Sequence, residues 1–76
     1  MFTAKRIKEL MDARPFSPFR ICMSDGHVYD IPNHEAAFVK RNFVEVAADP
    51  DADGIASTFH RCAILHITRI EEMQAA

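Results

Sequence analysis

Two stretches of alternating apolar residues flank Asp25-Gly26, and this arrangement limits the possible folds more than any other part of the sequence. From Phe19 to Met23 every second residue is large and apolar, which is the period of a half-buried strand. Both residues of an Asp-Gly pair tolerate the positive φ that a tight hairpin turn requires. The sequence therefore predicts an antiparallel hairpin whose return strand covers residues 27–31.

The residues before this hairpin have the period of a helix. Thr3 is a preferred N-cap, and Ile7, Leu10 and Met11 follow at spacings that place them on one stripe. The helix must end before Pro15, because the residue preceding a proline is pushed out of the helical region. We expect a helix of about three turns whose apolar stripe packs against the sheet.

The rest of the chain is predicted to add strands. In residues 32–42, Asn33 is placed to cap a short helix or to begin a structured loop. Residues 43–48 are predicted to form a third strand, and residues 57–70 one long strand or two strands divided by a bend at residues 61–63. From Glu71 onward we expect fraying or a last helical turn.

The predicted fold class is α+β, as a single domain over residues 1–76 in which the N-terminal helix packs on a small, strongly bent antiparallel sheet resembling a barrel. The order of elements is helix, hairpin, insertion, strand, turn, and one or two final strands. The expected core consists of Ile7, Leu10, Phe16, Phe19, Ile21, Phe43, Val46, Leu65 and Ile67.

Composition narrows the class of protein. Of the 76 residues, 49% are hydrophobic and 26% are charged, which is typical of a folded, soluble domain. So short a chain buries too little surface to hold a deep active-site cavity as well as a core, and association would bury more. No run approaches the roughly twenty apolar residues of a membrane span. We therefore expect a cytoplasmic homo-oligomer without a membrane partner, in which Cys22 and Cys62 are buried free thiols.

Two patterns raise the hypothesis of a metal site. In DPDADG, the carboxylates of Asp49, Asp51 and Asp53 fall at positions 1, 3 and 5 of a calcium-binding EF-hand loop, but position 12 is His60 instead of glutamate. The flanking segments are also β-prone, which favours an acidic hairpin loop. His60 and Cys62 could instead share one face of a strand and bind a transition metal. A metal-responsive protein is therefore one alternative.

Catalytic signatures are lacking in the sequence. Gly26 and Gly54 are its only glycines, so it contains no Gly-rich loop for phosphate and no strand-to-helix turn for a nucleophile. The sequence therefore predicts a protein that is not an enzyme and has no cofactor.

The basic residues near the N-terminus suggest a nucleic-acid interface. Lys5, Arg6, Lys8 and Arg20 are concentrated there, and the turn at Lys40-Arg41 would add to them if the fold brings the two together. With Phe38 or Tyr29 nearby, such a surface would bind single-stranded RNA by stacking and phosphate contact. The net charge of -2 instead favours a solvated helix face.

The order of RPFxPF, a strand, an Asp-Gly turn, PNHE and a closing HITRIE resembles a group of short bacterial proteins without an assigned activity, over about residues 10–72. The architecture is also similar to Sm-like proteins and SH3-like small barrels. This chain lacks the second-strand glycine and the Arg-Gly pair of the Sm pattern, so we transfer no binding residues from that family.

From these features we expect a non-enzymatic protein-interaction or regulatory module that self-associates through strand edges or the helix face. Its protein partner is not identified by the sequence. An Sm-like RNA-binding protein and a metal-responsive protein are the two alternatives.

Overall fold

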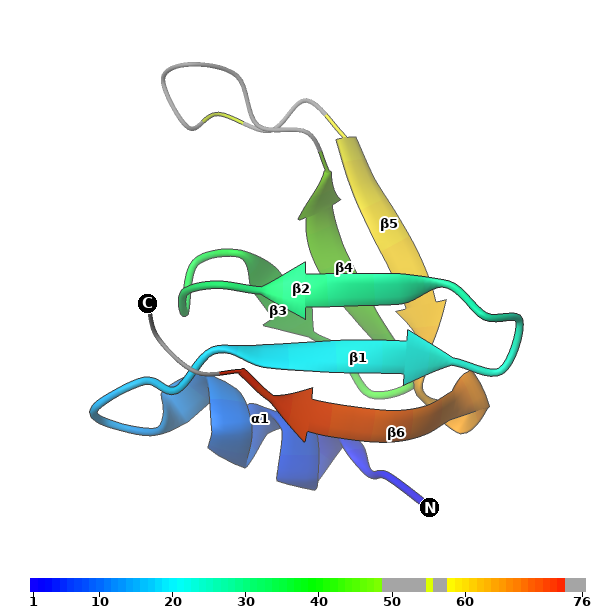
Figure 1. Cartoon of the computed structure of the whole chain (residues 1–76), viewed down its shortest axis with the longest axis horizontal. Coiled ribbons are helices and arrows are strands. Elements are labelled where there is room, and N and C mark those ends of the chain that lie inside the picture. Colours follow the sequence, from blue (N-terminus) through cyan, green and yellow to red (C-terminus); the bar gives the residue numbers. More distant parts are fainter. Residues whose placement is uncertain (49–54, 56–57, 74–76) are drawn as a thin grey trace.

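The computed structural model describes residues 1–48, 55 and 58–73, which form one helix and two antiparallel sheets (Figure 1). The sheets have strand orders β2-β1-β6 and β3-β4-β5, and the strands of one cross in front of the strands of the other. The elements are α1 (Ala4–Asp12), β1 (Phe19–Met23), β2 (Val28–Ile31), β3 (Ala37–Val39), β4 (Phe43–Ala48), β5 (Thr58–Ala63), the 3₁₀ helix η1 (Ile64–His66) and β6 (Ile67–Glu72). The α+β prediction is confirmed. The expected barrel is not closed, because the described strands pair within two separate sheets.

Helix α1 begins and ends as its sequence predicts. The Arg6 N–H donates to Thr3 Oγ1 at 3.2 Å, which satisfies one of the unpaired amides of the first turn. The helix ends at Asp12, and Ala13, two residues before Pro15, has left the helical region with φ -58° and ψ 139°. Ile7 and Met11 are buried in the core that both sheets share.

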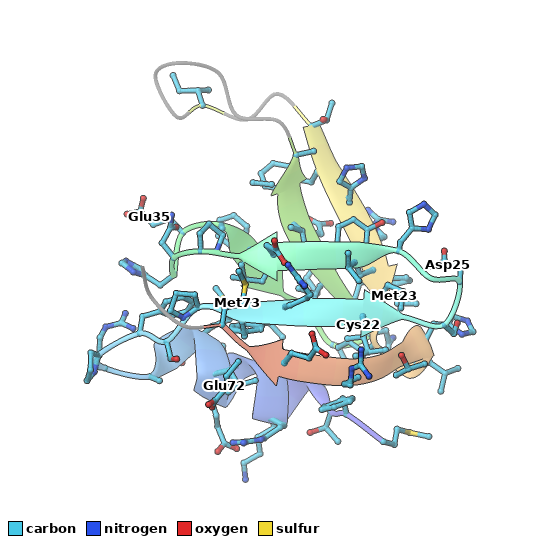
Figure 2. The ribbon with its side chains drawn as sticks, in the orientation of Figure 1. Cys22, Met23, Asp25, Glu35, Glu72 and Met73 are labelled. Atoms are coloured by element: carbon cyan, nitrogen blue, oxygen red, sulfur yellow. The ribbon has the colours of Figure 1, made fainter. Side chains whose placement is uncertain are left out.

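The predicted hairpin joins β1 to β2. Gly26 has φ +93°, and the Met23 N–H donates to the His27 carbonyl at 2.9 Å. Asp25 lies at the tip of the hairpin, beyond Cys22 and Met23 at the end of β1 (Figure 2). Its carboxylate accepts from the His27 N–H at 2.9 Å, and this hydrogen bond is the main reason why the pKa of Asp25 is lowered.

Of the two alternatives for the segment after β2, a short helix or a structured loop, residues 32–36 form the loop. Asn33 Oδ1 accepts from the Glu35 N–H at 2.9 Å, which forms a turn and not the first turn of a helix. The chain then enters β3, a strand that the sequence did not predict, and β3 pairs with β4. Three residues are too few for an alternating pattern to be recognised against the surrounding alanines.

The C-terminal half breaks later than expected. Residues 61–63 remain in β5, where Cys62 pairs with Val44, and the break is η1 at residues 64–66. The Ile64 N–H donates to the Asn42 carbonyl at 3.0 Å, which holds the turn at that position. Strand β6 then pairs with β1 through Glu72, so the expectation of fraying from residue 71 is wrong for residues 71 and 72.

The core agrees with most of the predicted positions. Ile7, Phe19, Ile21, Val46 and Ile67 are buried, and Leu10 and Phe16 are partly buried against them. Phe43 and Leu65 were wrongly assigned to the core, since they are 36% and 68% exposed. Their neighbours Val44 and Ile64 are buried instead, because one residue along a strand or tight turn reverses the direction of the side chain. Cys22 and Cys62 are both buried and free, as expected.

Candidate interaction surfaces

The outer face of the sheet β3-β4-β5 exposes aromatic rings. Phe38, Phe43 and Phe59 are 59%, 36% and 47% exposed, and we call these three residues the aromatic face. The rings of Phe38 and Phe59 lie 6.2 Å apart between centroids, on the two edge strands of the sheet. They point outward because Val44 and Val46 of the central strand take the inward positions of the pleat.

One carboxylate on the same outer face pairs with two cationic side chains. Glu45 Oε1 lies 3.2 Å from Lys40 Nζ and 3.4 Å from Arg61 Nη2, and the glutamate side chain is largely covered. The Arg61 guanidinium also lies 5.4 Å from the centre of the Phe43 ring, in cation–π geometry. The face therefore combines exposed rings with a carboxylate that already has two cationic partners.

Sequence reasoning identified only part of this face. Phe38 was considered for stacking, but Phe59 and Arg61 were not, because their position depends on the register of β5 against β4. The alternation of Val44, Val46 and Ala48 could have assigned Phe43 to the outer face.

The outer face of the sheet β2-β1-β6 is polar by comparison. Arg20 donates to Asp30 at 2.7 and 3.3 Å, and this pair raises the pKa of Arg20 and lowers the pKa of Asp30 mainly through the hydrogen bonds. Arg69 and Glu71 form a second pair at 2.9 Å. Arg20, one of the predicted nucleic-acid residues, is therefore already bound to a carboxylate.

The fold brings the basic residues of α1 and of the β3–β4 turn together. Lys5, Lys8, Lys40 and Arg41 line a hollow of about 600 Å³, which we call the basic groove. The fold thus meets the condition under which the Lys40-Arg41 turn would add to the helix cations. Arg6 does not line the groove and instead lies 3.8 Å from Glu9 on the helix.

A second hollow adjoins the first. It measures about 590 Å³ and lies between the N-terminus of α1, the β3–β4 turn and η1, and we call it the apolar pocket. Phe2, Phe43, Ile64 and Leu65 form much of its wall. The two hollows share Ala4, Lys5 and Arg41, so cations border an apolar surface along one continuous depression.

The metal hypotheses gain no support from the described residues. Asp49, Asp51 and Asp53 lie outside them. Cys62 is only 2% exposed, and burial raises the pKa of its thiol, which disfavours the thiolate that a metal requires. His60 is exposed, with its ring 5.3 Å from that of Tyr29. No group of three or more potential metal ligands occurs in the part of the chain that the structure describes.

No family model, curated protein or solved structure significantly matches this chain. The resemblance suggested by the sequence motifs therefore stays a prediction. Among residues 1–48, 55 and 58–73, no helix is long and apolar enough to cross a membrane.

Proposed function

We propose that this chain is a non-enzymatic interaction module that self-associates by packing the aromatic faces of two copies against each other. The observation behind this proposal is the contact between Phe38 and Phe59, two large rings that are half exposed on the outer surface of one sheet. Neighbouring exposed aromatic side chains are typical of surfaces that are covered in an assembly.

The exposed rings are large enough to drive a weak association. Phe38 and Phe59 together leave about 200 Å² of apolar surface in water, which is worth about 5 kcal/mol per copy if it becomes fully buried. Association of two copies costs about 4–15 kcal/mol in lost freedom, a range that includes the combined gain of about 10 kcal/mol. The largest net gain within this range is about 6 kcal/mol, so we expect a dimer with a Kd of roughly tens of micromolar or weaker.

A second copy suits this face for two reasons. Glu45 already has Lys40 and Arg61 as partners, so burial of the face leaves no unpaired carboxylate. A two-fold axis through the face would also place each aromatic pair against its own equivalent, which is the commonest arrangement of soluble dimers.

Light scattering over a wide range of protein concentration tests the proposal. We expect the mass to rise from monomer to dimer, and the rise to persist in high salt because the contact is apolar. The double variant Phe38→Thr/Phe59→Thr keeps strand propensity and should stay monomeric.

Val28→Thr is the matched control, since Val28 is 54% exposed on the other sheet and should not affect the dimer. A wild-type monomer at every concentration would refute the proposal. If the mass instead increases only on addition of RNA at low salt, the RNA-binding alternative becomes the better explanation.

A further inference from the structure

We propose that the basic groove and the apolar pocket together bind an acidic segment of a partner protein, with an apolar side chain in the pocket and carboxylates at Lys5 and Arg41. This surface goes beyond the proposed self-association, because Phe38 and Phe59 do not line either hollow. Phe43 of the aromatic face also lines the apolar pocket, and Lys40, the partner of Glu45 beside that face, also lines the basic groove.

The shape of the depression favours a peptide. Hollows of about 590 and 600 Å³ share Ala4, Lys5 and Arg41, so one ligand can extend from the pocket into the groove. Both hollows are open to solvent at the surface of a small domain. An extended chain that alternates apolar and acidic side chains matches such a depression better than a compact molecule that needs an enclosed cavity.

The charges around the groove favour a ligand with few negative groups. Lys8 Nζ lies 2.7 Å from Asp12, and Lys40 Nζ lies 3.2 Å from Glu45, so both lysines have carboxylate partners. Within the described part of the chain, no hydrogen bond or ion pair engages the side chain of Lys5 or Arg41. Two available cations suit two carboxylates, whereas a nucleic-acid backbone is held by many more.

The apolar wall next to these cations is fixed by the backbone. Ile64 is 6% exposed and anchors η1 in the core, while its N–H donates to the Asn42 carbonyl beside Arg41. The next residue, Leu65, is consequently held outward with 68% of its surface exposed. The Thr3 cap fixes the first turn of α1, from which Lys5 projects. Leu65, Lys5 and Arg41 are thus held in place before a ligand binds. This lowers the entropy cost of binding.

Selection from a random phage-displayed peptide library, using the full chain as bait, tests this inference. The double variant Lys5→Glu/Arg41→Glu serves as the parallel bait. We expect the enriched peptides to place aspartate or glutamate beside leucine, isoleucine or phenylalanine, and to be lost on the variant. A fluorescein-labelled copy of an enriched peptide then gives the Kd by anisotropy, and we expect the Kd to rise at least about tenfold in the variant and to rise with salt.

Arg6→Glu is the matched control, because Arg6 neighbours Lys5 on the same helix turn but does not line the depression. It should leave the Kd unchanged, whereas Leu65→Ala should raise it.

The inference is overturned if no peptide is enriched, if the enriched peptides lack acidic residues, or if the variant retains them equally. Binding of labelled oligouridylate that depends on Arg6 as much as on Lys5 would also overturn it in favour of RNA. Because Phe38→Thr/Phe59→Thr leaves this depression intact, that variant should still bind the peptide, which separates failure of this inference from failure of the dimer.

Discussion

Ile64 and Leu65 are neighbours in η1 with the same number of carbon atoms, but one side chain is buried and the other is exposed. Replacing each by alanine tests whether η1 directs Ile64 into the core and Leu65 to the surface. Ile64 is 6% exposed and belongs to the core, whereas Leu65 is 68% exposed. Removing a buried isoleucine side chain costs about 3 kcal/mol of unfolding free energy, from lost burial and the cavity left behind. Only about a third of the surface of Leu65 is covered by the rest of the protein. Its replacement by alanine should therefore cost about 1 kcal/mol of unfolding free energy or less.

Urea unfolding followed by far-ultraviolet circular dichroism measures this difference, at protein concentrations low enough to keep the chain monomeric. We expect Ile64→Ala to lose about 2 kcal/mol more unfolding free energy than Leu65→Ala, with the same slope against urea concentration. In thermal unfolding, the melting temperature of Ile64→Ala should lie about 10 °C below that of Leu65→Ala. Equal losses for the two variants would show that η1 does not direct these side chains as described. A larger loss for Leu65→Ala would restore the core position that the sequence suggested.

Three further perturbations test other parts of the structure. Gly26→Ala should lower stability by about 1 kcal/mol in urea unfolding, because an L residue is strained at φ +93° although no atom lies within 4 Å of the new Cβ; no loss would contradict the turn geometry. The lowered pKa of Asp30 means that its pair with Arg20 stabilises the fold above the ordinary carboxyl pKa, and this contribution is lost as the pH falls through the lowered value. A plot of stability against pH should therefore flatten in Asp30→Asn, and an unchanged slope would argue against the pair. Zinc should leave the melting temperature unchanged, since Cys62 is buried with a raised thiol pKa; a rise that is lost in His60→Ala would revive the metal hypothesis.

Local signals explain which elements of the fold could be predicted. The Thr3 cap and the Asp25-Gly26 turn act over a few neighbouring residues, so α1 and the first hairpin follow directly from the sequence. Strand β3 is held by its pairing with β4, and the position of η1 depends on a hydrogen bond to Asn42. The hydrogen bond to Asn42 joins residues that are distant in the chain, and β3 has only three residues, so periodicity reveals neither of them.

The candidate surfaces were predictable to a similar degree. The cations at Lys5 and Lys8 could be recognised from the sequence, but their meeting with Arg41 depended on the fold. Hydrophobicity alone assigned Phe43 and Leu65 to the core, although both line the apolar pocket. An exposed apolar residue at a binding surface has the same composition as a core residue, so only its direction distinguishes the two.

The pairing of β1 with β6 determines when this domain can fold during synthesis. Strand β6 supplies one of the two neighbours of β1, and the Met73 N–H donates to the Pro18 carbonyl at 2.8 Å. These contacts join the beginning of the sheet to residues about fifty positions later, which slows folding because a long loop must close first. On the ribosome, the central strand of the first sheet therefore lacks one partner until residue 72 has left the exit tunnel. Until then the backbone N–H and C=O groups on that edge of β1 are open to pairing with chaperones and with other nascent chains.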